Sequence, residues 1–344
     1  MQKASSTVRD VARRLPARRP SSVRRTTDIQ VVPESAWDGD LEVRGSARDA
    51  RVDGRGTLTA SETTRLHLTL DNRSVVTGLA AGLPGAVADA LVGSAAAGGF
   101  RARLRALPEG SLDPDSPAAA LLDDLPTVRL IAGYGRLIEM GPQPGRPAAP
   151  LPGICTGWAP GGTADRRAQA GERLLGQAPA APPFRSLLDH PDDFHPADFH
   201  PADSHAADFH AADLRPETPP ERSSMRRRRI LEVARHGGDL DIYQYFRDSH
   251  LDAAGREGSL HEYELHAVAT QGSLTLSALS VRPRALPFPE CPLAAAEVGV
   301  LLGTSLYDIE DSVRARLSGT RGCTHLSDVL RFLRFAGPLA DRLM

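Results

Sequence analysis

The sequence predicts an α+β protein built from two related domains in tandem. Three observations support this prediction: the length of 344 residues, a segment near residue 40 that recurs near residue 240, and a change in each copy from strand to helix periodicity. This length accommodates two ordinary domains with substantial cores. We expect each domain to contain an antiparallel sheet of three or four strands followed by three helices, which cover one face of the sheet.

The repeat is visible when the chain is compared with itself. A shift of 199 residues places residues 39–53 on 238–252 with six identities in fifteen positions, where unrelated sequences would share about one. The same shift superposes Leu66-His67 on Leu265-His266 without a gap. This period is too long for a solenoid, so we interpret it as a tandem duplication. The two copies are expected to pack on each other as a pseudo-dimer.

Alternating hydrophobicity marks the strands in both copies. Residues 41–48 and 240–247 alternate between apolar and polar side chains, the pattern of a half-buried strand in an antiparallel sheet. Two further strands are expected in each copy, around residues 66–71 and 74–79 in the first and residues 263–269 and 274–281 in the second.

Helical patterns follow the strands. In the first copy they cover residues 86–94, 99–106 and 117–125, and in the second residues 291–303, 306–317 and 324–336.

Other segments separate these copies. We expect residues 1–27 to form a disordered basic arm and residues 28–140 to form a degenerate first copy. Residues 141–222 are expected to be a linker, and residues 223–344 to form the second copy. Residues 141–220 hold 15 of the 28 prolines, which is typical of a linker.

The linker contains two motifs. Its apolar island, Gly-Ile-Cys-Thr-Gly-Trp at residues 153–158, could dock on a folded copy. Its Asp/His pentapeptide array is interpreted as low-complexity sequence that could collect metal only weakly; its histidines are His195, His200, His205 and His210.

Composition excludes several classes of function. The formal net charge is −2, so nucleic acid is an unlikely partner. Lys3 is the only lysine, which argues against Schiff-base, P-loop and kinase chemistry. Residues 75–100 are nearly uncharged but rich in Ala and Gly, so we expect no membrane span there. Three cysteines and no signal-peptide pattern favour a cytoplasmic location, and the heavy use of Ala, Gly and Pro suggests a bacterial source.

Charged residues next to the predicted strands are expected to be exposed or to hold turns. The basic run Arg226–Arg229 is expected to be solvated. Asp49 and Asp248, each preceded by an arginine, are expected to hold turns through side-chain-to-backbone bonds.

Cysteine and histidine residues mark a candidate site in the second copy. Cys323 and His325 align with alanines of the first copy, and His261 aligns with Glu62. Cys291 lies at the start of the first predicted helix of its copy. We therefore place any functional site in the second copy.

Three interpretations of this site remain open. In the first, which we prefer, the cluster is non-catalytic and the protein binds a small molecule or a partner. In the second, Cys323 is a nucleophile with His325 or His261 as base, acting on an acyl or thioester substrate. In the third, Cys291, Cys323, His261 and His325 bind zinc, the one cofactor these residue types suggest. Whether the protein is an enzyme stays open.

The motifs of the second copy resemble a known family. Gly-Cys-Thr-His-Leu at residues 322–326, a Pro-aromatic-x-x-Cys element ending at Cys291, and His261 in a strand resemble the bacterial domain-of-unknown-function family twenty-eight eighty-nine. The resemblance covers residues 223–335, with an echo in residues 23–125, and the two-copy form with a Gly-Ile-Cys linker resembles actinobacterial members. The resemblance implies a site but no reaction. The residues of that site are His261, Pro287, Cys291, Gly322, Cys323, Thr324, His325 and Leu326.

Overall fold

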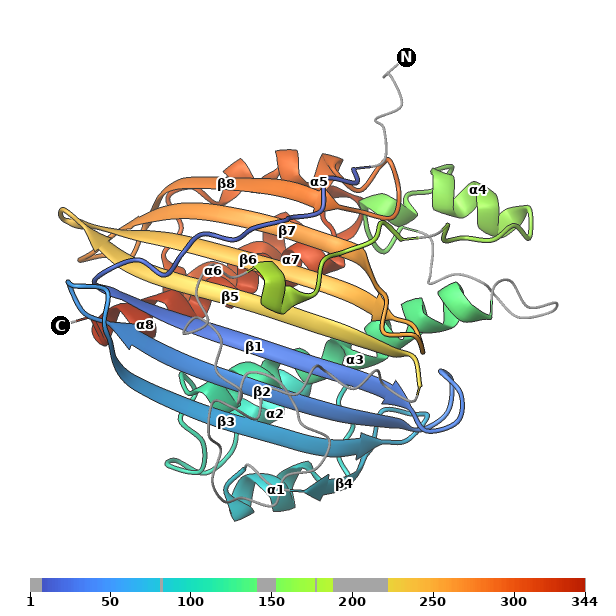
Figure 1. Ribbon diagram of the computed structural model, residues 1–344, viewed down its shortest axis with the longest axis horizontal. Coiled ribbons are helices and arrows are strands. Elements are labelled where there is room, and N and C mark those ends of the chain that lie inside the picture. The colour runs from blue at the N-terminus through green and yellow to red at the C-terminus, as the bar shows by residue number, and fades with distance from the viewer. Residues whose placement is uncertain (1–7, 81–82, 141–152, 177, 188–221, 344) are drawn as a thin grey trace.

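Eight antiparallel strands form one continuous sheet in the computed structural model, which describes residues 8–80, 83–140, 153–176, 178–187 and 222–343 (Figure 1). Their order is β4-β3-β2-β1-β5-β6-β7-β8. The first half supplies β1 (Ser22–Pro33), β2 (Leu41–Val52), β3 (Leu58–Leu70) and β4 (Val76–Ala80). The second supplies β5 (Ser224–His236), β6 (Asp239–Leu251), β7 (Glu257–Thr270) and β8 (Leu276–Ala285).

The two halves meet edge to edge at the centre of this sheet. β1 pairs antiparallel with β5, with Thr27 opposite Arg229. Both halves also have a register shift at corresponding places, after Thr69 in β3 and after Val268 in β7. The predicted α+β class is confirmed, and the predicted packing of the copies takes the form of a shared sheet.

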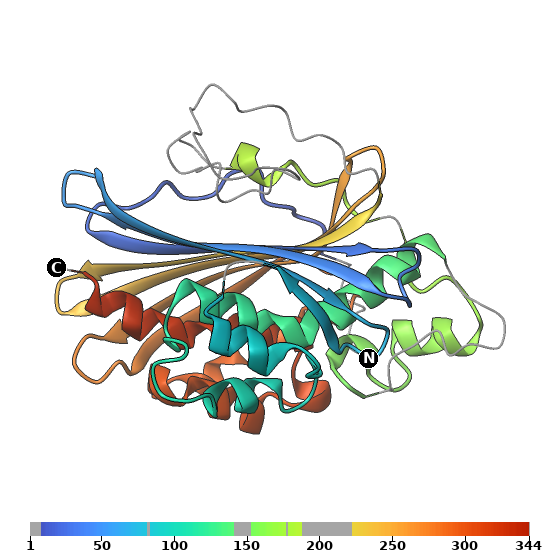
Figure 2. The same cartoon turned by 90° about the horizontal axis from the view of Figure 1, so that it is seen from below.

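Helices of both halves cover one face of the sheet, as Figure 2 shows. The first half contributes α1 (Gly85–Leu91), α2 (Phe100–Arg105) and α3 (Pro117–Glu139). α3 is longer than its apolar pattern predicted and continues through Pro126. The second half contributes α5 (Leu293–Ala296), η6 (Val298–Leu301), η7 (Leu306–Asp308), α6 (Ile309–Arg316), η8 (Gly319–Arg321), α7 (Thr324–Phe332), η9 (Leu333–Phe335) and α8 (Ala336–Asp341).

On the opposite face, the N-terminal segment and η2 (Phe184–Leu187) cover part of the central strands (Figure 2). Residues of the N-terminal segment and of η2 form a small buried cluster against β5 and β6. The Leu15 N–H donates to the Leu187 carbonyl, 2.8 Å away. The boundary that we expected at residue 27 falls inside β1, so residues 22–27 belong to the sheet rather than to an arm.

The basic run Arg226–Arg229 is buried in β5, contrary to our expectation of a solvated segment. It lies at the centre of the sheet, where helices cover one face and the N-terminal segment covers the other. Carboxylates from neighbouring strands and helices compensate its charge, as buried ion pairs require.

Two other segments complete the description of the linker. η1 (Thr156–Trp158) and α4 (Thr163–Gln169) pack beside the second half, where Thr156 bonds the Gly322 carbonyl and Thr163 bonds Glu290. The Asp/His array lies outside the described residues. Across the residues that the structure describes, no helix combines the length and apolar character needed to cross a membrane.

Candidate functional site

Three adjacent strands of the second half align the polar residues of the site. Arg227 of β5 lies opposite Asp248 of β6, and Asp248 lies opposite His261 of β7. Arg227 donates two hydrogen bonds to Asp248, of 2.9 and 2.8 Å. Asp248 therefore belongs to a buried ion pair and not to a turn, which corrects our prediction for it.

α7 brings Cys323 and His325 to these strands. A side chain at position 322 would overlap the Leu317 backbone, which explains the glycine before Cys323. Cys323 is extended and precedes the first turn of α7, so it need not point away from His325 as two helical residues at this spacing would. The Cys323 Sγ and His325 Nδ1 atoms are 4.0 Å apart.

The two histidines stack on each other above Asp248. The ring centroids of His261 and His325 are 3.5 Å apart and their planes differ by 12°. The Tyr134 ring of α3 forms T-shaped contacts with both histidine rings, with centroids 5.0 Å from His261 and 5.4 Å from His325. His325 Nε2 lies 3.6 Å from Asp248 Oδ2. His261 Nδ1 and His325 Nε2 are buried without a hydrogen-bond partner.

A network of buried charges supports Arg227 from the helix side. Its Nη1 atom bonds Asp124 of α3 and Asp328 of α7, at 3.1 and 2.9 Å. Arg229 binds Asp124 with two further bonds, of 2.9 and 2.7 Å. Burial alone would raise the pKa of Asp124, but Arg229 and Arg227 lower it to about 2. Asp124 therefore stays ionised at neutral pH.

The apolar island of the linker, residues 153–158, packs against the part of the site that contains the cysteines. Thr156 donates through its N–H and its hydroxyl to the Gly322 carbonyl, at 2.8 Å in each case. Gly157 packs so closely that an added Cβ would lie 2.6 Å from Cys291 Sγ. The Trp158 and Phe288 rings pack in a T-shaped arrangement, with their centroids 5.5 Å apart. We call residues 153–158 the strap.

The thiols and imidazoles of this site are uncharged at neutral pH. Burial raises the pKa values of Cys323 and Cys291, and it raises that of Cys155 to about 11. Burial also lowers the pKa values of His261 and His325 well below the usual range. Neutral thiols and neutral imidazoles are therefore the resting state.

The structure brings together most of the residues predicted from sequence. His261 and His325 are in direct contact, Cys323 adjoins His325, and Tyr263 donates to Cys323 over 3.5 Å. Cys291 lies against the strap. All four predicted residues are buried.

Sequence reasoning missed Asp248, Tyr134 and Arg227 as neighbours of the site. Asp248 falls inside the repeat, so its signal was present but was assigned to a turn. Tyr134 and Arg227 come from elements whose positions no local pattern indicates.

A pocket of about 290 Å³ opens beside the N-terminus of α7. Leu130 of α3, Ile154 of the strap and Leu317 form apolar parts of its wall. Cys323 also lines it but is only 3% exposed.

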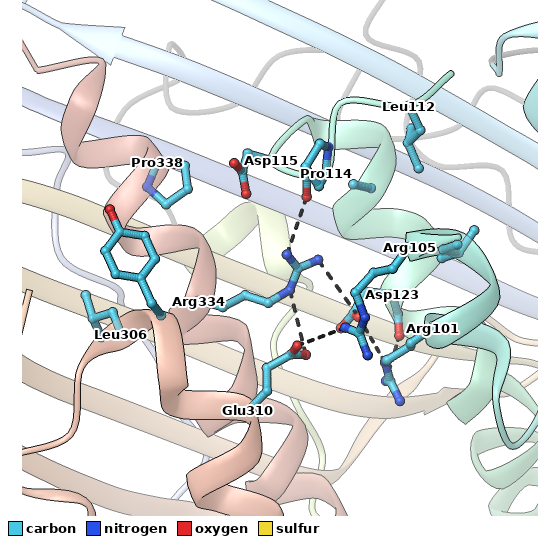
Figure 3. A pocket seen from close by; sticks show the side chains of 13 residues that line it. Arg101, Arg105, Leu112, Pro114, Asp115, Asp123, Leu306, Glu310, Arg334 and Pro338 are labelled. Carbon is cyan, nitrogen blue, oxygen red and sulfur yellow. Dashed lines mark hydrogen bonds and ion pairs between the residues drawn. The ribbon is translucent and has the colours of Figure 1, made fainter. Parts of the chain in front are cut away.

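A second cavity, of about 250 Å³, lies where the helices of the two halves meet (Figure 3). Its apolar wall includes Leu104, Leu112 and Leu306. Its charged wall alternates in sign and consists of Arg101, Arg105, Asp115, Asp123, Glu310 and Arg334.

Arg334 is the least satisfied cation of this wall. Its nearest carboxylate oxygens, of Glu310 and Asp123, are 3.8 and 4.0 Å away. It donates one long hydrogen bond, of 3.4 Å, to the Pro114 carbonyl, and its buried Nε has no hydrogen-bond partner. Burial lowers the pKa of Arg334.

The second half matches a known protein family. Residues 224–336 match the model of a family described as "Protein of unknown function (DUF2889)". The match contains Asp248, His261, Cys323 and His325, so the family resemblance of this half is confirmed. Neither the search of curated proteins nor that of solved structures found a match.

Proposed function

We propose that this protein binds a small amphipathic carboxylate in the cavity between the helices of its two halves, and that the Cys/His cluster is non-catalytic. The observation that carries this proposal is the position of Arg334. Its guanidinium faces a cavity with leucine walls but has no carboxylate within 3.5 Å. A ligand carboxylate would supply the charge-assisted hydrogen bonds that Arg334 lacks.

The apolar wall defines the rest of the ligand. Leu104 of α2 and Leu306 of η7 come from different halves, so an acyl chain between them would be enclosed by both. Small-molecule sites combine such apolar walls with a few polar groups that fix orientation. The volume of about 250 Å³ restricts the ligand to a small molecule.

Most of the other charged side chains of this wall are already paired with one another. Arg101 and Arg105 bond Asp123 and Glu310 respectively, so these four side chains already compensate one another. Burial raises the pKa of Asp115, the remaining acid of the wall. Arg334 is therefore the group on which a carboxylate would act.

Isothermal titration with hexanoate tests this proposal. We expect saturable binding to the full chain and much weaker binding of hexanamide, which has the same shape without the charge. Arg334→Gln should weaken hexanoate binding about 10- to 100-fold, since a hydrogen bond to a charged group contributes about 1.5–3 kcal/mol.

A matched arginine provides the control. Arg314 of α6 is exposed and bonds only Asp311 among the described residues, so Arg314→Gln should leave binding unchanged. Equal binding of hexanoate and hexanamide, or equal loss in both variants, would contradict the proposal.

The catalytic alternative is supported by one contact. Cys323 Sγ lies 4.0 Å from His325 Nδ1 and borders the pocket beside α7. Burial opposes it, because a raised thiol pKa and a lowered imidazole pKa disfavour the thiolate–imidazolium pair that such chemistry uses. Rapid alkylation of Cys323 by iodoacetamide at neutral pH would favour an enzyme acting on an acyl or thioester substrate.

A further inference from the structure

The first half shows what the corresponding space of the second half could hold. Asp49 lies opposite Glu62 across β2 and β3, as Asp248 lies opposite His261 across β6 and β7. Between Asp49 and Glu62 lies a cation: Arg342 Nη1 is 2.6 Å from Asp49 Oδ2 and 3.5 Å from Glu62 Oε2. The fold therefore places a positive charge at this position in one of its two halves.

The second half replaces the groups around that position with metal-binding side chains. Glu62 becomes His261, and His325 stands where the aligned position of α3 is Ala120. One donor atom from each of Asp248, His261 and His325 can be chosen such that all three lie within 4.8 Å of one another. All three residues are buried.

Two of these donors are unused. His261 Nδ1 and His325 Nε2 are buried and lack hydrogen-bond partners. Leaving such a group unpaired costs about 1–3 kcal/mol. Unpaired imidazole nitrogens beside a carboxylate form the donor set that divalent first-row transition metals such as zinc accept.

We propose that Asp248, His261 and His325 bind one divalent transition-metal ion. The separation of 3.6 Å between Asp248 Oδ2 and His325 Nε2 is close to the ~3.4 Å expected for two ligands ~2.1 Å from a tetrahedral ion. Arg227 holds Asp248 with two hydrogen bonds and so orients the carboxylate ligand from outside.

Binding requires one movement. The histidine rings are stacked with planes only 12° apart, and the nitrogen lone pairs lie in the ring planes. Both lone pairs can point at one ion only when one ring turns about its Cβ–Cγ bond. The metal-bound state therefore replaces the stacked pair with two rings that converge on the ion.

Zinc alone is the probe for this site. The sample is the full, untagged chain in which His195, His200, His205 and His210 are changed to Asn, so that the Asp/His array contributes no background. After dialysis against a chelator, competition titration should show one zinc ion per chain. His325→Gln and His261→Gln should each weaken binding by at least about 100-fold, because loss of an outer partner alone costs about 10- to 100-fold.

His266 supplies the matched control. It lies on β7 with His261 but is exposed, so His266→Gln should leave zinc binding unchanged. Circular dichroism checks that each variant is folded. No stoichiometric zinc, or zinc binding unaffected by both site variants, would overturn the proposal.

Cobalt substitution tests the donor set without any variant of the site. A Co²⁺ ion held by two imidazoles and a carboxylate should show visible ligand-field bands and no sulfur-to-cobalt charge-transfer band. A strong charge-transfer band would mean that Cys323 or Cys291 is a ligand, as in the set that we predicted from sequence, and would overturn the Asp/His/His assignment.

Discussion

Arg227 and Asp248 form a doubly hydrogen-bonded pair across β5 and β6, and Arg25 and Asp49 repeat it across β1 and β2, with two bonds of 2.7 Å. The partners are 21 residues apart in the second half and 24 in the first. A single sequence shift therefore aligns the aspartates but not the arginines. This pair is the polar centre of each half.

Asp248→Asn should strongly destabilise the fold. The change leaves the buried Arg227 with one carboxylate fewer, and removal of one partner from a buried pair costs about 3–5 kcal/mol. Urea unfolding measures the difference. Asp252→Asn on an exposed turn should cost less than about 1 kcal/mol, since its partner Arg256 is 82% exposed. Similar losses in both variants would show that the buried pair has no special role.

Acid should destabilise the metal-free protein below pH 6.5. His261 and His325 have lowered pKa values, so the unfolded chain takes up protons in this range while the folded chain does not. Stability therefore falls as pH decreases from 6.5, by up to about 1.4 kcal/mol per pH unit for each histidine. Urea unfolding between pH 8 and 5 measures this slope. His325→Gln should reduce it, and an unchanged slope would contradict the neutral, buried state of this ring.

The three thiols should react slowly with iodoacetamide in the folded protein at pH 7.5. Alkylation requires an accessible thiolate, and Cys155, Cys291 and Cys323 are buried with raised pKa values. Mass spectrometry of tryptic peptides, with urea-unfolded protein as the reference, gives each rate. Selective rapid labelling of Cys323 would instead indicate an activated nucleophile.

Gly157→Ala should loosen the strap. The new methyl group would lie 2.6 Å from Cys291 Sγ, so either the strap or the Cys291 side chain must move. We expect this to lower the free energy of unfolding by about 1–3 kcal/mol. Alkylation of Cys291 should then become faster. Gly176→Ala is the matched control, because an added Cβ there meets nothing within 4 Å. Equal labelling of Cys291 in both variants would contradict the close packing of the strap.

Local patterns predicted much of the fold. Period-two hydrophobicity located β2, β3, β6 and β7 because one face of each strand packs on helices. It missed β1 and β5 because these central strands are covered on both faces and contain buried arginines in place of apolar residues. The join between the halves depends on these two strands, so it was not predictable from periodicity.

Only those residues of the candidate site that differ between the two halves could be predicted from the sequence. The comparison of the two copies singled out Cys323, His325 and His261, since the first copy has other residues at those positions. Asp248 is the same in both copies, so that comparison passes over it. The cavity at Arg334 comes from helices of both halves, so neither half alone carries a sequence pattern that indicates it.

Methyl-resolved NMR of leucine-labelled protein during a hexanoate titration tests the proposed binding function most directly. Saturable shifts are predicted for the methyl groups of Leu104, Leu112 and Leu306, which line the cavity at Arg334. Shifts confined to Leu130 and Leu317, beside Cys323, or no saturable shifts at all, would contradict it.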